Sequence, residues 1–309
     1  MFQFNSFAKI NLGLEIIDKR PDGYHNLKTI FQTIDLFDTL KIKENNTREI
    51  HLSGDNSSIE WNEQNTIWQA IHAIYNNYNV CHGFDIFVEK RIPTGSGLGG
   101  GSSNAAVILL FLNDYFKLGL TLENLINIGV KIGADIPFFL VGGTVLAQGI
   151  GEKLTPLEDL EEKQVDIIIP PINVSTRLIF SHFSLTSNPI NSKIHIFVKS
   201  KNYRILENSL EAVTFKLFPE VEAVKEKMKK LEYELVLMSG SGSAVYGITT
   251  KQEMGTKAIH LKNRFPNANV FVSRTIGRKD YFNRIGASPS GKASVFGADT
   301  TEVRILPPQ

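Results

Sequence analysis

Alternating apolar positions predict that the first third of the chain consists of strands joined by turns. In AKINLGLEII the apolar side chains stand at positions 10, 12, 14 and 16, the period of a strand with one buried face. KRPDGYHN then carries a Pro-Asp-Gly turn signal, and LKTIFQTIDLF predicts a returning strand. A further strand is predicted over residues 84–92 (FDIFVEKRI).

A helical pattern follows these strands. Residues 102–116 are apolar nearly all round, which predicts a deeply buried helix. A second helix is predicted from Thr121 to Ile132, followed by a strand in VGGTVLAQG. After the polar and charged stretch 152–164, the pattern predicts a strand in VDIIIPP and a helix around VEAVKEKMKKL. ELVLMSGSGSAVYGI predicts two strands joined by a glycine-serine loop.

The order of these elements indicates the fold class. Strands and helices alternate irregularly, which favours an α+β fold over a regular doubly wound sheet. We place a domain boundary in the polar stretch, so that one domain covers residues 1–155 and a second covers 156–284. Residues 285–309 are rich in Gly, Ala, Ser, Thr and Pro, and we expect a loosely ordered tail there.

Composition excludes several classes of protein. The chain has 33 basic and 32 acidic residues, which argues against a strongly basic nucleic-acid binder. Its one cysteine, Cys81, excludes an intramolecular disulfide and a metal site built on cysteines. We find no secretory signal and no apolar run near the ~20 residues that span a bilayer. We therefore expect a cytoplasmic protein, a monomer or weak homodimer, without nucleic-acid or membrane partners.

The stretch IPTGSGLGGGSSNAA is the strongest candidate for a binding loop. Glycine lets the backbone approach an anion closely, and a helix that starts at Ser102 would add roughly half a positive charge at its N-terminus. A flexible linker is the alternative, but linkers do not abut a fully apolar helix. We therefore predict a phosphate cradle. Its residues are Pro93, Thr94, Gly95, Ser96, Gly97, Leu98, Gly99, Gly100, Gly101, Ser102, Ser103 and Asn104.

Other glycine-rich motifs fit this loop less well. G-x-G-x-x-G is present, but a dinucleotide-binding site also needs a second strand and an acidic residue ~20 positions on. Here the helix runs into more helix, and the nearest acidic candidate, Asp114, lies inside it. G-x-x-x-x-G-K-[ST], H-R-D and D-F-G are absent, which excludes a Walker loop and a protein kinase.

Two ionisable residues stand in apolar segments. Lys9 lies in the first predicted strand, and Asp135 lies in GADIPFF. Burying a charge is costly unless it is paired, and perturbed ionisable groups gather at functional sites. A lysine on the outer face of a strand and an aspartate that caps a turn are the structural alternatives. Tyr24 and His25 also have a structural alternative, because turn propensity alone would place them in an exposed surface turn.

Four segments, taken in order, resemble the GHMP kinases, the superfamily of galactokinase and of the homoserine, mevalonate and phosphomevalonate kinases. They are FAKINLGLEIIDKRPDGYHNLKTIFQTIDLFD, P-T-G-S-G-L-G-G-G-S-S-N-A-A, GADIPFFLVGGTVLAQGIGEKL and LMSGSGSAVYG. The resemblance covers roughly residues 5–280. It implies a two-domain fold, with a ribosomal S5 domain 2-like N-terminal domain and an α/β C-terminal domain. It also implies ATP as co-substrate with Mg²⁺.

The resemblance implies roles for single residues. Lys9 would stabilise charge, Asp135 would act as base toward the substrate hydroxyl, and Asn11 would contact that hydroxyl. Ser103 would be the hydroxyl that faces the metal. The glycine-serine loop over residues 239–243 would shape the site beside the phosphate cradle; a plain tight turn is the alternative.

Within the superfamily, three aromatic residues indicate a cytidyl substrate. By resemblance, Tyr24 stacks on a cytosine, His25 bonds its edge and Phe180 closes the other side. The resemblance thus implies an alcohol kinase of the non-mevalonate route to isoprenoid precursors. A GHMP kinase for a small alcohol such as homoserine or mevalonate is one alternative. A non-catalytic ligand sensor is another, although it would be expected to lack Lys9 or Asp135.

Overall fold

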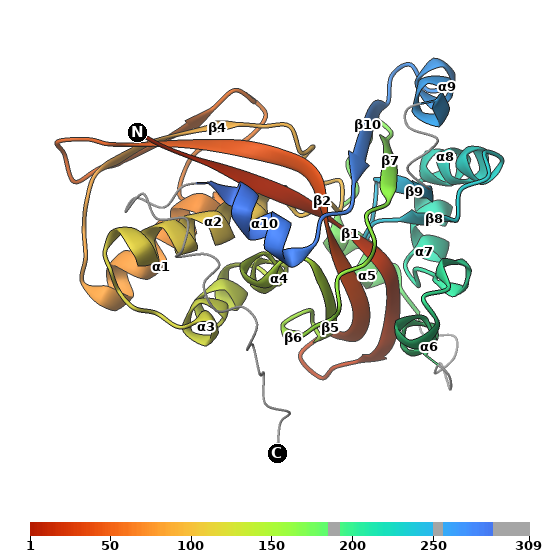
Figure 1. Cartoon of the computed structure of the whole chain (residues 1–309), viewed down its shortest axis with the longest axis horizontal. Coiled ribbons are helices and arrows are strands. Elements are labelled where there is room, and N and C mark those ends of the chain that lie inside the picture. The colour runs from red at the N-terminus through yellow and green to blue at the C-terminus, as the bar shows by residue number, and fades with distance from the viewer. Residues whose placement is uncertain (185–191, 250–255, 287–309) are drawn as a thin grey trace.

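Two long strands organise the fold, which we describe from a computed structural model over residues 1–184, 192–249 and 256–286. β1 (Phe2–Lys19) and β2 (His25–Glu44) pair antiparallel as a hairpin. At about 3.3 Å per residue, a strand as long as β1 extends about 60 Å. The hairpin therefore reaches from the helices of the first domain to those of the second (Figure 1).

The first sheet has the order β3-β4-β2-β5-β6, with β1 paired to β2. Its other strands are β3 (Ile50–Gly54), β4 (Phe84–Glu89), β5 (Thr144–Gly149) and β6 (Lys153–Pro156). Four helices pack against it in one apolar core: α1 (Thr66–Tyr78), α2 (Gly100–Tyr115), α3 (Leu122–Ile132) and α4 (Ile136–Val141). The sequence pattern did not indicate α4. Pro137 suggests a break, yet proline is tolerated in the first turn of a helix.

The second sheet has the order β10-β7-β9-β8. Its strands are β7 (Gln164–Ile169), β8 (Leu235–Met238), β9 (Val245–Thr249) and β10 (Asn269–Arg274). The helices around it are α5 (Thr176–His182), α6 (Lys193–Ser200), the 3₁₀ helix η1 (Tyr203–Ile205), α7 (Glu211–Leu217), α8 (Pro219–Lys229) and α9 (Thr256–Arg264). The far end of the hairpin packs into this half, because Leu14 and Ile16 belong to its core. The two sheets confirm the predicted α+β class.

The last described helix, α10 (Arg278–Ile285), returns to the first sheet. Tyr281 is fully buried there, with its ring 5.7 Å from that of Phe7, and its hydroxyl donates to the Phe139 carbonyl. The sequence reasoning had grouped this segment with the second domain and begun the tail at residue 285. The rest of that predicted tail, 287–309, lies outside the described residues.

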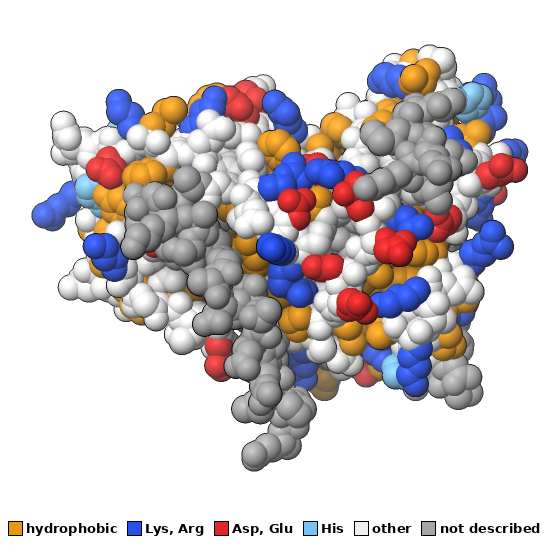
Figure 2. Space-filling view, viewed as in Figure 1, with side chains coloured by type: hydrophobic (Ala, Val, Ile, Leu, Met, Phe, Trp, Pro, Cys, Tyr) orange, Lys and Arg blue, Asp and Glu red, His pale blue; other side chains and the backbone are white. Residues whose placement is uncertain are grey.

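Charged side chains of both signs are mixed on the face that Figure 2 shows, in keeping with the nearly balanced composition. One such group joins the two halves of the molecule, because the Asp35 carboxylate accepts from Arg274 at 3.0 Å and from Arg284 at 2.6 Å. Among the described helices, none has the length and apolar character needed to cross a membrane.

Candidate active site

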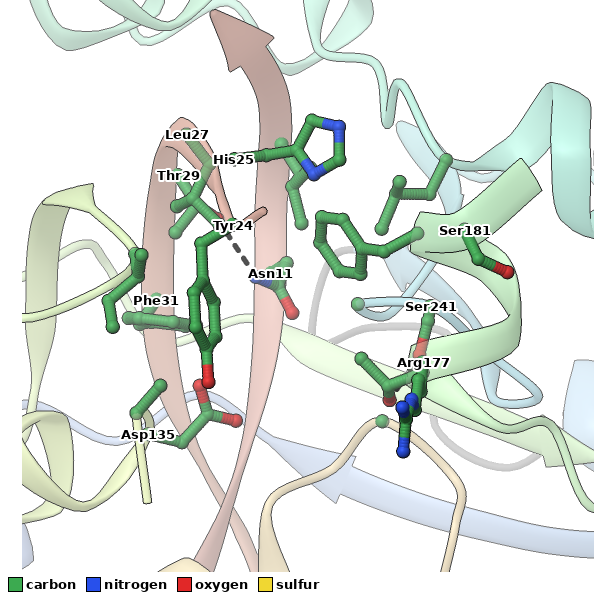
Figure 3. Close-up of a pocket in the computed structure, with 18 of the residues that line it drawn as sticks. Asn11, Tyr24, His25, Leu27, Thr29, Phe31, Asp135, Arg177, Ser181 and Ser241 are labelled. Atoms are coloured by element: carbon green, nitrogen blue, oxygen red, sulfur yellow. Dashed lines mark hydrogen bonds between the residues drawn. The ribbon is translucent and has the colours of Figure 1, made fainter. Parts of the chain in front are cut away.

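A cavity of about 850 Å³ lies where the hairpin meets α5 and the two glycine-rich loops. It is lined by residues from both halves of the chain. Those used below are Lys9, Asn11, Lys19, Tyr24, His25, Thr29, Phe31, Gly97, Asp135, Thr176, Arg177, Phe180, Gly240 and Ser241. Figure 3 shows Tyr24 and Asp135 on one side of Asn11, and Arg177 and Ser241 on the other. The fold therefore brings Lys9, Asn11, Tyr24, His25, Asp135 and Phe180 to one space, with Gly97 as the one residue of the predicted phosphate cradle in the lining.

Lys9 is buried in the floor of this cavity, with 3% of its surface exposed. Its Nζ donates to Asn11 Oδ1 at 2.7 Å and lies 3.6 Å from Asp135 Oδ2. The Phe31 ring lies under the ammonium, 5.0 Å from Nζ to the ring centroid. Burial lowers the pKa of Lys9, and the nearby Asp135 carboxylate opposes that shift. The outward-facing alternative for this lysine is therefore wrong.

Asn11 orients the lysine and is itself held in place. Its Nδ2 donates to Thr29 Oγ1 at 2.8 Å, and Thr29 Oγ1 donates to the Gly13 carbonyl at 2.6 Å. These two hydrogen bonds leave the Asn11 amide oxygen facing the Lys9 ammonium. Asn11 is 2% exposed, so its side chain has little freedom to turn away. A network in which each partner is satisfied fixes a side chain firmly.

Asp135 is held at the opening by the backbone rather than by its own hydrogen bonds. It is the N-cap residue of α4, but its side chain caps no backbone N–H. Every residue of α4 is buried, which fixes the helix and hence the position of the aspartate. About a third of the Asp135 side chain, 34%, is exposed. The carboxylate thus pairs with Lys9 and stays partly exposed.

The glycine loop has the conformation that its sequence predicts. Gly95, Gly97 and Gly99 have φ of +63°, +79° and +76°, in the left-handed region that favours glycine. A Cβ on Gly97 would lie 2.2 Å from the Ser239 carbonyl oxygen. In the described part of the chain, the N–H groups of Gly99 and Gly100 have no protein acceptor. Such N–H groups at the start of a long helix suit phosphate.

Helix α2 starts at Gly100, two residues before the predicted start, because Gly99 in the left-handed region serves as its N-cap. This shift changes the directions of the following side chains. Ser103 is fully buried, and its Oγ accepts a hydrogen bond from Ser6 Oγ at 2.7 Å. Ser102, Ser103 and Asn104 all lie outside the residues that line the cavity, and Ser103 differs in that its hydroxyl is engaged by Ser6. The metal role that the resemblance implied for Ser103 stays a prediction, and this hydrogen bond favours its neighbours over it.

The loop over residues 239–243 packs directly against the glycine loop. Ser239 Oγ donates to the Gly97 carbonyl at 2.9 Å, and the Ala244 N–H donates to the Ser96 carbonyl at 3.0 Å. Asn208 Nδ2 donates to the Gly240 carbonyl at 2.7 Å and so fixes the loop from behind. The predicted neighbourhood of the two loops is confirmed. Its effect is to hold the glycine loop in one conformation.

Two of the three predicted cytosine-binding side chains, His25 and Phe180, lie together at the other end of the cavity, whereas Tyr24 lies on the Asp135 side (Figure 3). His25 is buried, its ring 5.4 Å from that of Phe180, and Tyr24 is 61% exposed. The turn before them is set by Asp22, whose carboxylate accepts from Arg20 and from the Tyr24 N–H at 3.1 Å. Burial, and then the positive charge of Lys19, lowers the pKa of His25, which keeps the imidazole neutral at pH 7.

Sequence reasoning missed one buried ion pair that supports the glycine loop. Asp38 is fully buried and pairs with the Lys90 ammonium. The same carboxylate accepts from the N–H groups of Arg91 and Ile92 at 2.8 Å each. These three donors immediately precede the loop, so Asp38 fixes the chain where the loop begins. The only sequence signal is an aspartate inside an apolar strand, LFDTLKI.

Comparisons with known proteins show the family to which the chain belongs. The GHMP kinases N terminal domain matches residues 65–143, and GHMP kinases C terminal matches 198–265. The 4-diphosphocytidyl-2-C-methyl-D-erythritol kinase of Alkaliphilus metalliredigens is 41% identical, covering 80% of this chain and 87% of that protein. The protein of the same name in Lachnoclostridium phytofermentans is 36% identical, covering 84% and 92%.

Solved structures show the same relationship. A crystal structure of 4-(cytidine 5'-diphospho)-2C-methyl-D-erythritol kinase has a TM-score of 0.76 and 31% identity, and it covers 89% of this chain and 99% of that one. A homoserine kinase from Cytophaga hutchinsonii has a TM-score of 0.71 at 17% identity, which shows a shared fold. The chain therefore belongs to the 4-diphosphocytidyl-2-C-methyl-D-erythritol kinases, a family of GHMP kinases.

Proposed function

We propose that this protein transfers the γ-phosphate of ATP to the 2-hydroxyl of 4-diphosphocytidyl-2-C-methyl-D-erythritol, giving the 2-phosphate and ADP in the methylerythritol phosphate route to isoprenoid precursors. One observation carries the proposal beyond family membership. A single cavity has the Lys9–Asp135 pair at one end and the His25–Phe180 rings at the other. An elongated substrate with a base at one end and a polyol at the other fits that arrangement.

The reacting groups have complementary roles. The substrate hydroxyl oxygen forms a bond to the γ-phosphorus while the bond from that phosphorus to the β,γ-bridging oxygen breaks. Asp135, with its partly exposed carboxylate, accepts the hydroxyl proton. The Lys9 ammonium stabilises the negative charge that develops on the transferring group. Asn11 keeps the ammonium directed at that point, since it accepts from Lys9 Nζ at 2.7 Å.

The phosphates of ATP belong on the glycine loop, whose N–H groups and following helix α2 suit an anion. Mg²⁺ requires oxygen ligands, mostly from phosphates and water, with one or two from the protein. Two oxygens at the start of α2 fit that need. Ser102 Oγ lies near the segment that carries Asp135, because a Cβ built on Gly133 would be 3.7 Å from it. Asn104 Oδ1 is buried without a hydrogen-bond partner among the described residues. When bound, Mg²⁺ would neutralise charge on the phosphate oxygens.

The test is ADP release with ATP and Mg²⁺, with each candidate alcohol supplied separately. We expect turnover with 4-diphosphocytidyl-2-C-methyl-D-erythritol and none with homoserine, mevalonate or galactose. Turnover with one of the other alcohols instead would overturn the proposed substrate while leaving the Lys9–Asp135 roles in place. Nucleotide binding without turnover on any alcohol would favour the ligand-sensor alternative.

A further inference from the structure

One cation in the cavity has no role in the chemistry described so far. Arg177 lies on α5, lines the cavity and is exposed. Within residues 1–184, 192–249 and 256–286, its guanidinium makes no hydrogen bond and no ion pair. Two other cations near the glycine loop are already engaged, Lys9 by Asn11 and Asp135 and Lys90 by Asp38. An arginine that points into a cavity without a protein partner is available for an anionic ligand.

Contacts along α5 place Arg177 between the two ends of the cavity. The preceding residue, Thr176, is joined through its Oγ1 to Ser241 Oγ at 2.8 Å. Gly240, the residue before Ser241, lies close to Asn11, because a Cβ built on Gly240 would be 3.5 Å from Asn11 Oδ1. This side of the helix therefore adjoins the Lys9 end of the cavity. Figure 3 shows Arg177 beside Ser241, across the cavity from Asp135.

The other end of the same helix face carries Phe180. Residues three apart lie on one face of a helix, and they are separated by about 4.5 Å along its axis. The Phe180 ring contacts His25, which marks the cytosine end. Arg177 therefore stands on α5 between the contact with Ser241, at the Lys9 end, and the contact of Phe180 with His25, at the cytosine end.

The proposed substrate has its diphosphate at that point in its structure, because the order is base, ribose, diphosphate and polyol. We propose that Arg177 binds the diphosphate of the cytidyl substrate and so sets its preference for a nucleoside diphosphate; this rests on the proposed function. A guanidinium presents its donors in a planar fork that pairs with two phosphate oxygens at once. The bond orients the polyol toward Lys9 as well as adding affinity.

Lys19 is the competing cation in the cavity lining. It lies opposite His25 in the register of β1 and β2, at the end of the hairpin. Lys9 is ten residues earlier on the same strand. A diphosphate bound by Lys19 would lie beyond the cytosine, on the side away from Lys9 and Asp135. That position does not connect the base to the reacting hydroxyl, so the geometry favours Arg177.

The experiment compares the affinities of cytidine, CMP and CDP by calorimetry, for the full chain and for Arg177→Ala and Arg177→Lys. In the unmodified protein, CDP should bind more tightly than cytidine. Arg177→Ala should weaken CDP binding about 10-fold or more, leave cytidine binding unchanged and leave the KM for ATP unchanged. Arg177→Lys should recover part of the loss, because lysine keeps the charge but not the fork. Arg48→Ala, an exposed arginine in the loop after β2 and outside the cavity lining, is the matched control.

Three outcomes would count against the inference. Equal losses for cytidine and CDP would show that Arg177 supports the nucleoside site or the fold, which the melting temperature would also report. A raised KM for ATP with CDP affinity unchanged would assign the guanidinium to ATP. An undiminished preference for CDP in Arg177→Ala would remove the role altogether. Failure of the unmodified protein to bind any cytidine compound would instead overturn the proposed function itself.

Discussion

The Lys9 ammonium is almost wholly buried, yet the Asp135 carboxylate 3.6 Å away is one-third exposed. The two members of the pair therefore differ in the free energy that their desolvation costs on folding. A buried ammonium loses its hydration, and one partly solvated carboxylate at 3.6 Å compensates only in part. The lowered pKa of Lys9 reports that imbalance, since burial is its largest cause. We therefore expect function, rather than stability, to account for a lysine in this position.

Lys9→Met should separate the two effects. The variant keeps the length of the apolar stem and removes the charge, so we expect kcat to fall by about 100-fold or more while the melting temperature is unchanged or rises. Steady-state kinetics and thermal unfolding measure the two quantities on one sample. Near-normal turnover would refute the role of Lys9 in charge stabilisation.

The affinity for cytidine compounds should depend on pH through His25. Its pKa lies below the usual 6.5, so the ring stays neutral as the pH falls to that value and becomes protonated only below it. Protonation removes the ring nitrogen that accepts a hydrogen bond. The dissociation constant of CDP, measured by calorimetry, should be flat from pH 8 to about 6.5 and rise at lower pH.

Lys19→Ala supplies the control for this pH dependence. The positive charge of Lys19 helps to lower the pKa of His25, so its removal should move the loss of affinity toward higher pH. The midpoint should stay at or below the usual value, because burial, the larger cause, remains. A pH profile that is the same with and without Lys19 would exclude His25 as the group that titrates.

Gly97→Ala tests whether the two loops must touch. A Cβ at Gly97 would meet the Ser239 carbonyl oxygen at 2.2 Å, and φ is +79°. Gly119→Ala is the matched control, because Gly119 also has a positive φ, +66°, but nothing lies within 4 Å of its Cβ position. Both variants should lose about 1 kcal/mol to backbone strain. Only Gly97→Ala should raise the KM for ATP markedly, and equal KM values would argue against a fixed loop.

Asp38→Asn should destabilise the fold and weaken ATP binding together. Breaking a buried pair costs about 3–5 kcal/mol, because the remaining charge is left uncompensated, and here that charge is the Lys90 ammonium. Lys229→Gln is the control, since its partner Glu226 is half-exposed at 2.7 Å and such pairs contribute about 1 kcal/mol or less. Chemical denaturation gives the stabilities. The loop role would be contradicted by an unchanged KM for ATP in folded Asp38→Asn.

Local sequence signals determined much of this protein. Alternation in AKINLGLEII and the turn signal in RPDGYH predict the hairpin, because strand period and turn chemistry act over a few residues. The glycine run of the loop predicts an unusual, closely approaching backbone, and the structure has positive φ at Gly95, Gly97 and Gly99 and a close approach at Gly97. The resemblance in four ordered segments then indicates the family and gives the chemistry of Lys9 and Asp135 as a hypothesis.

Tertiary structure decided which of these residues meet and which face the cavity. Lys9 and Asp135 are brought together only because α4 packs, wholly buried, beside the first strand of the hairpin. The start of α2 at Gly100 goes with a Ser103 that is buried against Ser6, a side-chain direction that helix boundaries predicted to within two residues cannot resolve. From the sequence alone, Arg177 is an ordinary exposed arginine. Its place between the two ends of the cavity arises from contacts between α5 and the loop at Ser241, which lie far apart along the chain.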